Sequence, residues 1–345
     1  MTSEISSTNS ICSIPAGTQV LLTGASGFTG TVLAKKLVQC GLRVRAIARE
    51  SSNISALADL PIDWIRGEVY DPETVAAAAK DVSYVFHLAA AYRTAGLSDD
   101  IYQMVHVEST RLLARACLEN KNFKRFVHVS TVGVHGHIER PPADENYRFA
   151  PGDVYQETKA KAEIFLREFA AANNLPFTVI RPAAIYGPGD KRLLKIFKMA
   201  ARPIYPIVGN GKCLYHLIHV EDLTNAIICA ANHPAAKNEV FICGDEQSSS
   251  LPEMARVIAE SLGRQTRPLR IPAWPIFLLA DVCEAVCKVL KISPPIYRRR
   301  VAFYTKDRAF DTKKIRKLLG YKPIYTAETG LRELSAWYLQ QGWLR

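Results

Sequence analysis

The chain has 345 residues, of which 48% are hydrophobic and 22% are charged, and it carries a formal net charge of +11. This is the composition of an ordinary globular protein with room for two lobes, and no apolar stretch reaches the roughly 18 residues that a transmembrane helix requires. The positive excess lies in residues 264–345, with 17 Lys and Arg against 6 Asp and Glu, which suits an anionic ligand or membrane surface. Without a nucleic-acid motif we expect no nucleic-acid partner.

The chain begins with a polar segment that contains no basic residue. We expect residues 1–17 to form a flexible polar tail and not a secretory signal, which needs basic residues before a longer apolar run. The cysteines further along show no paired metal-ligand spacing, so the sequence predicts a cytoplasmic protein with reduced thiols and no metal site. The eight cysteines are Cys12, Cys40, Cys117, Cys213, Cys229, Cys243, Cys283 and Cys287.

From residue 18 onward, short apolar runs alternate with longer segments of helical periodicity. The alternation is typical of an α/β fold with a doubly wound parallel sheet, the Rossmann arrangement, over residues 18–188. After Pro188, proline-interrupted elements predict a smaller substrate-binding lobe over residues 189–345, from which segments near 215–243 return to the Rossmann sheet. The predicted strands begin at Gln19, Arg43, Ile62, Val82, Arg125 and Phe177, and the predicted helices cover 28–39, about 101–120 and the segment around Tyr155.

A glycine-rich segment, LLTGASGFTG, joins the first predicted strand to the first predicted helix. Gly24, Gly27 and Gly30 follow the spacing GxxGxxG, and glycines at such a turn let the backbone approach a pyrophosphate at the helix N-terminus. Three glycines also occur in plain turns, but a strand before and a helix after favour dinucleotide binding. The intervening residues Ser26, Phe28 and Thr29 would share this contact.

The residues after the second predicted strand indicate which dinucleotide binds. Enzymes that use NAD usually place an acidic residue there to bind the ribose 2′-hydroxyl. This chain has Arg49, followed by Glu50. A guanidinium suits a 2′-phosphate, so the sequence favours NADP, while Glu50 leaves NAD open.

The segment DVYQETKAKAE, residues 153–163, places Tyr155 and Lys159 one helical turn apart. A pair with this spacing is often simple packing on a helix surface. The alternative is chemical, because a phenol with a pKa of about 10 is too weak a base at neutral pH, and a neighbouring ammonium lowers that pKa.

The glycine loop, STVGVHG at Ser130 and YQETK at Tyr155 occur in the order of an extended short-chain dehydrogenase/reductase of the NAD-dependent epimerase/dehydratase family, which the chain resembles over about residues 18–340. The segments HLAAAY, VIRPAAIYGPGD, LIHVEDL and FDTKKIRKLLGYKP add to this resemblance. It implies that Tyr155 is the general acid/base and that Lys159 tunes the phenol and bonds the nicotinamide ribose. Either Ser130 or Thr131 would bond the substrate oxygen, and the spacing to Gly136 favours Thr131.

The resemblance also implies cofactor contacts at the ends of other strands, and it shows three departures from the family pattern. His106 and Ser109 stand where the family has asparagine and glycine, and Glu68 stands where an aspartate usually meets the adenine. The implied contact residues are Glu68, Val69, Leu88, Ala89, Ala90, Pro182 and Ala183.

The segment IPAWPIFLLADVCEAVCKVLKISPP, which begins at Ile271, bears on the substrate. It is apolar except for one stripe at helical spacing, and YRRR follows at Tyr297. One interpretation is a helix packed on the lobe; the other is an interfacial helix, through which residues 271–300 touch a membrane and admit a lipophilic substrate. The residues of the polar stripe are Asp281, Glu284, Lys288 and Lys291.

This region resembles the 3β-hydroxysteroid dehydrogenase branch of the family and the nearby dihydroflavonol reductases. The first hypothesis is therefore an NAD(P)-dependent dehydrogenase/reductase of an apolar secondary alcohol or ketone, either sterol-like or a long-chain β-hydroxy/keto compound. The alternatives are a sugar-nucleotide epimerase/dehydratase and a non-catalytic dinucleotide sensor, although a sensor would need neither Tyr155 nor Lys159. The resemblance also implies a homodimer that forms through the helices before and at Tyr155.

Overall fold

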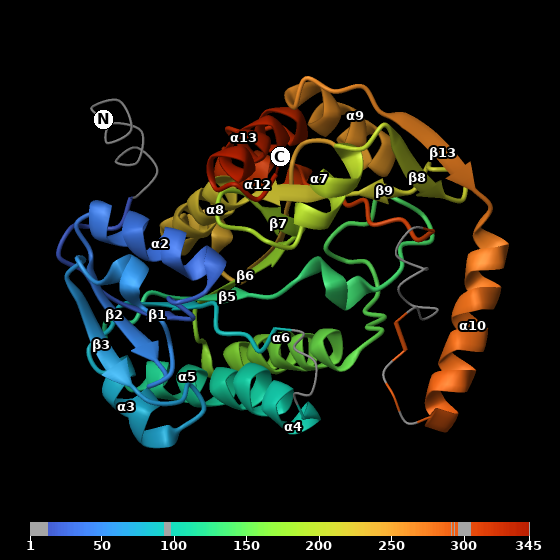
Figure 1. The fold of residues 1–345 in the computed structure, drawn as a ribbon. Coiled ribbons are helices and arrows are strands. Elements are labelled where there is room, and N and C mark those ends of the chain that lie inside the picture. The colour runs from blue at the N-terminus through green and yellow to red at the C-terminus, as the bar shows by residue number, and fades with distance from the viewer. Residues whose placement is uncertain (1–12, 93–97, 291, 293, 296–304, 345) are drawn as a thin grey trace.

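The computed structural model describes residues 13–92, 98–290, 292, 294–295 and 305–344 (Figure 1). Its main body is a seven-stranded parallel sheet in the order β11-β6-β5-β4-β1-β2-β3. The predicted doubly wound α/β fold is therefore confirmed, with the order reversing between β1 and β4 as such sheets do at their ligand site. The strands are β1 (Gln19–Thr23), β2 (Arg43–Ala48), β3 (Ile62–Arg66), β4 (Tyr84–His87), β5 (Arg125–Val129), β6 (Phe177–Pro182) and β11 (Glu239–Cys243).

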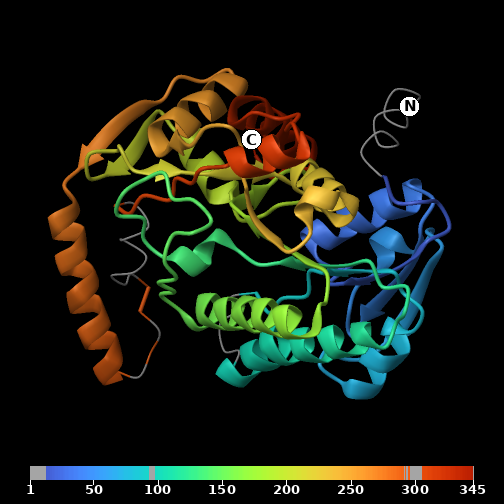
Figure 2. The same ribbon diagram turned by 180° about the vertical axis from the view of Figure 1, so that it is seen from behind.

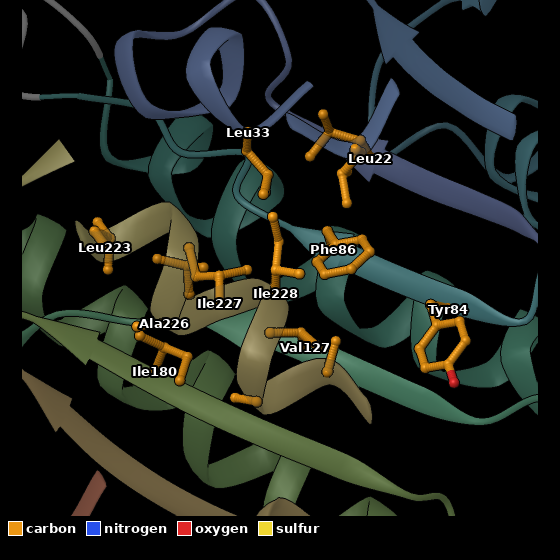
Figure 3. Close-up of a cluster of buried hydrophobic side chains, with 14 of the residues drawn as sticks. Leu22, Leu33, Tyr84, Phe86, Val127, Ile180, Leu223, Ala226, Ile227 and Ile228 are labelled. Carbon is orange, nitrogen blue, oxygen red and sulfur yellow. The ribbon is translucent and has the colours of Figure 1, made fainter. Parts of the chain in front are cut away.

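Helices cover both faces of this sheet (Figures 1 and 2). On one face, apolar side chains of α2 and α8 pack on those of the central strands (Figure 3), and on the other face α3, α5 and α6 enclose a second apolar cluster. Apolar runs flanked by amphipathic helices produce this layering, because each layer buries its apolar side against the sheet. The helices are α2 (Phe28–Gln39), α3 (Pro72–Ala79), α5 (Ser109–Leu118), α6 (Val154–Asn173) and α8 (Val220–Asn232).

The predicted helix over 101–120 is interrupted. It consists of a short helix α4 (Asp99–Tyr102), a π-helical segment (Gln103–Glu108) and α5. A helix-period pattern in the sequence cannot show this extra residue per turn, because one π-turn shifts the apolar stripe only locally.

The C-terminal lobe has its own apolar core, formed mainly by α7, α9 and α13. Its strands pair as β10 with β7, β12 with β9 and β13 with β8, so β11 is the segment near 215–243 that lies in the main sheet. The lobe helices are α7 (Leu194–Ala200), α9 (Leu251–Ser261), α10 (Ala273–Leu290), α12 (Lys313–Leu319) and α13 (Ala327–Gln340). The lobe strands are β7 (Ala184–Tyr186), β8 (Ile204–Val208), β9 (Leu214–Tyr215), β10 (Leu217–His219), β12 (Ser249–Ser250) and β13 (Arg267–Ile271).

Helix α10 forms an edge of the molecule (Figures 1 and 2). Of its predicted polar stripe, Asp281 and Lys288 are exposed and Glu284 is half-buried, whereas Lys291 and the YRRR segment lie outside the described residues. Within the part of the chain that the structure describes, no helix is long and apolar enough to cross a membrane, and no three His, Cys, Asp or Glu side chains could jointly hold a metal ion.

Candidate functional site

The glycine-rich turn between β1 and α2 is packed so closely that two of its positions exclude a side chain. Gly24 has a φ of 77°, and a Cβ there would lie 2.8 Å from the backbone nitrogen of Ala89. A Cβ on Gly30 would lie 2.0 Å from the carbonyl oxygen of Gly24. Glycine is therefore required at both positions, and the first turn of α2 rests directly on the end of β1.

The N-terminus of α2 is open to a ligand. Its N-cap residue, Gly27, makes no side-chain cap, and the first turn contains no acidic residue. Ser26 and Gly27 are exposed, while Phe28 and Thr29 are half-buried. Free N–H groups at the positive end of a helix dipole are what dinucleotide phosphates bind. This cradle fits the pyrophosphate of NAD or NADP.

The other predicted cofactor residues lie at the carboxyl ends of neighbouring parallel strands. They are Glu68 and Val69 after β3, Leu88, Ala89 and Ala90 after β4, and Pro182 and Ala183 at the end of β6 and just after it. The backbone N–H of Ala89 donates to the hydroxyl oxygen of Thr23, the last residue of β1, at 3.2 Å. Because parallel strands end at one edge of a sheet, the structure places these residues along the edge that carries the glycine turn, with Ala89 next to it.

Two guanidinium groups, and not one, lie at the ends of β2 and β3. Arg49 follows β2 directly and is exposed, as is Glu50. Arg66, the last residue of β3, lies in register with Ala48, and its guanidinium donates to the carbonyl oxygen of Arg49 at 3.1 Å. Two adjacent cations suit a 2′-phosphate better than one. No motif marks Arg66, and only the strand register reveals it.

Helix α6 begins beside the end of β5 and carries the predicted catalytic pair in its first turns. Asp153 caps the helix, accepting the backbone N–H of Gln156 at 2.7 Å. Tyr155 is half-buried, and the buried Lys159 donates from Nζ to the carbonyl oxygen of Val129, at the end of β5, at 3.0 Å. Burial lowers the pKa of Lys159 from 10.5 to about 8. The ammonium is therefore still the main form at neutral pH.

Both candidate hydroxyl residues follow β5 directly. Ser130 is buried, and its Oγ has no hydrogen-bond partner among the described residues. Thr131 is half-buried, and its Oγ1 accepts the backbone N–H of Gly133 at 3.0 Å. This leaves the hydroxyl hydrogen of Thr131 available for donation to a substrate oxygen. Both residues stay candidates, and Thr131 is the more accessible.

The π-helical segment brings His106 against Tyr155, the predicted catalytic residue. The His106 ring meets the Tyr155 ring edge to face, with 5.3 Å between centroids. Its Nε2 accepts the backbone N–H of Ala91 at 3.0 Å, so Nδ1 carries the hydrogen and donates to Thr158 Oγ1 at 2.8 Å. Burial lowers the pKa of His106 to about 2. The His106 ring is therefore neutral and is held in one orientation beside Tyr155. The sequence marked His106 only as a departure from the family pattern and did not predict this contact.

The second departure, Ser109, belongs to an adjoining buried network. Its Oγ donates to the carbonyl oxygen of Val105 at 2.6 Å and lies 3.2 Å from Nε2 of His87. The other ring nitrogen of His87 bonds Thr23 Oγ1 at 2.7 Å. Ser109 and His87 thus link the π-helical segment to the end of β1.

Arg192, in the lobe, reaches over the glycine turn. Its guanidinium carbon lies 5.5 Å from the ring centroid of Phe28 and 5.8 Å from that of Tyr92, and Nε donates to Asp190 Oδ1 at 2.7 Å. Tyr92 in turn meets the Tyr155 ring edge to face, with 6.2 Å between centroids. Arg192 and Tyr92 therefore link the glycine turn to Tyr155, the predicted catalytic residue. They lie far apart in the sequence, which is why the motifs missed them.

A buried ion pair holds α6 on the sheet. Arg181 of β6 and Glu163 of α6 are both buried, and Arg181 Nε donates to Glu163 Oε2 at 3.1 Å. The same guanidinium contacts Nε2 of His135 at 3.1 Å and the carbonyl oxygen of Glu145 at 2.8 Å. A paired charge in a dry interior is held in one geometry, so this network fixes the height of α6, and with it Tyr155, above the sheet.

Comparisons with known proteins give the family of the chain. The model of the NAD dependent epimerase/dehydratase family matches residues 20–244. The 3beta-hydroxysteroid-dehydrogenase/decarboxylase isoform 2 of Arabidopsis thaliana is 27% identical to this chain. The match covers 92% of this chain and 62% of that protein. The UDP-glucose 4-epimerase of Vibrio cholerae is 26% identical, with 93% of this chain and 95% of that protein covered.

Among solved structures, that of gox2253 matches with a TM-score of 0.79 and 27% identity, covering 94% of this chain and 99% of that one. The chain thus spans nearly the whole of the bacterial epimerase but less than two thirds of the plant dehydrogenase. Its relatives divide between steroid dehydrogenases and a sugar-nucleotide epimerase.

Proposed function

We infer the function of this chain from its family, because it belongs to the NAD dependent epimerase/dehydratase family. We propose that it is an NAD(P)-dependent dehydrogenase/reductase that interconverts an apolar secondary alcohol and its ketone. The observation that carries the proposal is the pair Tyr155 and Lys159 at the start of α6, with the ammonium buried against the carbonyl oxygen of Val129 beside an open dinucleotide cradle.

Tyr155, Lys159 and a hydroxyl residue each have a separate role in the proposed proton transfer. The Tyr155 hydroxyl donates a proton to the ketone oxygen during reduction and, as phenolate, removes it from the alcohol during oxidation. The ammonium of Lys159, buried one turn away, favours the phenolate electrostatically. A hydroxyl of Thr131 or Ser130 bonds the substrate oxygen and holds it within reach of the phenol. The nicotinamide of the bound dinucleotide would supply or accept the hydride.

The cofactor that we propose is NADP, with NAD as the alternative. Arg49 and Arg66 support this choice because both guanidinium groups lie at the strand ends where the adenosine ribose is bound in this fold. Glu50, exposed beside them, is the residue that would serve NAD. Arg49→Ala together with Arg66→Ala should raise the Kd for NADP at least tenfold more than that for NAD, as measured by calorimetric titration.

For the substrate we propose a sterol-like or long-chain β-hydroxy/keto compound. Support comes from the steroid dehydrogenases among the relatives and from the apolar helix α10, which stands on the side of the molecule toward which the N-terminal end of α6 points (Figures 1 and 2). The alternative is a sugar-nucleotide epimerase/dehydratase, supported by the Vibrio cholerae relative. An epimerase returns its cofactor to the starting redox state in each turnover, so it shows no net change in reduced nicotinamide.

The test follows reduced-nicotinamide absorbance with a panel of sterols and long-chain β-hydroxy compounds, with NADP and NAD in parallel. We expect net reduction that is lost in Tyr155→Phe and kept in Tyr84→Phe. Tyr84 is a matched control, because it lies at the start of β4, away from the cradle, and its hydroxyl donates to Asn232 Oδ1. Binding of the dinucleotide without turnover on any member of the panel would overturn the substrate class, and a sugar nucleotide consumed without net reduction would establish the alternative.

The proposal also includes a cytoplasmic enzyme that works as a homodimer and touches a membrane peripherally through residues 271–300. Exposed Leu118 on α5 and Ile164 on α6 support a dimer through these helices. Light scattering should give twice the chain mass, and Ile164→Glu should shift the protein toward the monomer.

A further inference from the structure

Helix α10 presents an apolar side to the outside of the molecule. Its buried residues, Ala280 and Cys287, mark the side that packs on the protein. Successive residues advance by about 100° around a helix, and the opposite side, an arc of roughly 160°, therefore carries no charged residue. The exposed apolar side chains on it are Trp274, Leu278, Leu279, Val282, Val286 and Leu290.

The strand that leads into α10 also exposes apolar side chains. In the β8–β13 pair, Tyr205 and Ile207 point into the lobe core. Because side chains alternate along a strand, the neighbouring residues point outward, and Ile204 and Leu269 are 57% and 53% exposed. We call Ile204, Leu269 and the exposed apolar residues of α10 the docking face. A monomer seldom exposes this many apolar side chains along one arc of a helix without a partner.

Cations border the docking face. Arg267 of β13, which is in register with the outward-pointing Ile204, and Lys288 of α10 are exposed, against one exposed acid, Asp281. Lys288 and Asp281 lie beside each other at one margin of the apolar arc and not within it, as their helical spacing requires. Residues 264–345 as a whole carry 17 basic and 6 acidic residues. An apolar face with a basic margin is the pattern of a helix that lies in the interface of an anionic bilayer.

We propose that the docking face binds the surface of a bilayer that contains anionic lipid, with α10 lying in the interface. The helix lies in this plane and does not span the bilayer, because Ala280 and Cys287 remain packed on the protein. Docking rests on the proposed function in one respect only: an apolar substrate would be taken up from the lipid on which α10 lies.

A second copy of the chain is the competing occupant. Two docking faces in contact would bring two basic margins together, and like charges repel in an interface. Anionic lipid instead neutralises the same cations, at about 1 kcal/mol for each Lys or Arg near the surface. The charge therefore favours the bilayer over self-association.

The test is flotation of the full chain with vesicles of phosphatidylcholine alone and of phosphatidylcholine with 30% phosphatidylglycerol. We expect binding to the anionic vesicles only, weakened by added salt. The double variant Leu278→Glu with Val282→Glu should reduce the bound fraction at least tenfold. Ile324→Glu is the matched control, because Ile324 is 65% exposed and lies outside the docking face, and it should float like the native chain.

Tryptophan emission gives a second measurement that does not depend on how the double variant folds. Trp274 is the most exposed of the apolar side chains, at 71%, so anionic vesicles should shift the native emission to shorter wavelength, and Trp274→Phe should abolish the shift. Equal flotation of the double variant and the native chain would overturn the proposal. So would an absence of flotation of the native chain, and a mass that is then lower in the double variant than in the native chain would assign the face to a second copy. If the native chain floats with anionic vesicles but turns over no sterol or long-chain β-hydroxy compound, only the proposed function is refuted.

Discussion

The two longest helices of the described chain, α6 and α10, use their side chains in opposite ways. Helix α6 buries a lysine and a glutamate, Lys159 and Glu163, whereas the buried side chains described in α10 are Ala280 and Cys287, and Leu278 and Val282 lie in solvent. Each buried charge of α6 has a partner, the carbonyl oxygen of Val129 or the guanidinium of Arg181. Charged side chains are therefore buried where the fold supplies a polar partner. An apolar face that the fold leaves exposed indicates a partner outside the chain.

The largest expected effect tests the chemistry at the start of α6. Tyr155→Phe keeps the ring and its contacts with His106 and Tyr92 but removes the proton that is transferred. We expect kcat to fall about a thousandfold, the usual contribution of a general acid/base, with the Kd for the dinucleotide nearly unchanged. Steady-state kinetics and calorimetric titration measure the two. A fall of less than tenfold would move the acid/base role to another group.

The next effect tests whether the buried ion pair holds α6 in place. Glu163→Gln leaves the buried Arg181 without a counter-charge, and breaking such a pair costs about 3–5 kcal/mol of the free energy of unfolding. The matched control is Glu328→Gln in α13, because Glu328 pairs with Arg332 on the surface, where such pairs contribute about 0–1 kcal/mol. Urea unfolding should separate the two variants clearly, and equal losses would mean that burial does not decide the difference.

A smaller effect tests the charge on Lys159. Its pKa is 10.5 when unfolded and about 8 in the fold, so above pH 8 the folded chain releases a proton that the unfolded chain still holds. Stability should therefore rise between pH 8 and 10.5, by at most about 3 kcal/mol. The cofactor-free protein unfolded in urea at several pH values should show this rise, and Lys159→Met should lack it. Parallel profiles for the two proteins would contradict the burial of the ammonium.

The smallest expected effect lies in α10. Leu278→Ala should change the free energy of unfolding by less than about 0.5 kcal/mol, because its side chain is exposed. The same substitution at the fully buried Leu166 of α6 should cost about 2–5 kcal/mol. Urea unfolding of both variants in the absence of lipid makes the comparison. A large loss at Leu278 would show that the face is part of the fold and not a docking surface.

Much of the nucleotide half could be predicted from sequence because its signals are local. The strands at Gln19 and Arg43 and the helix Phe28–Gln39 each lie where the apolar periodicity placed them. The π-helical turn at His106 could not be predicted, because one extra residue per turn leaves the apolar pattern almost unchanged. Arg66 and Arg192 carry no motif, and they reach the site only through strand register and the approach of the lobe.

By itself, the sequence determined the parts that depend on neighbours along the chain. These are the alternation of strands and helices, the glycine turn at Gly24 and the spacing of Tyr155 and Lys159 on one helix face. Only the tertiary structure decided which distant groups meet and which remain exposed. Examples are the contact of His106 with Tyr155, the ion pair of Arg181 and Glu163, and the side of α10 that lies in solvent. The physical reason is that backbone conformation is set by short-range sterics and periodicity, whereas burial and pairing require residues that are distant in the sequence to meet.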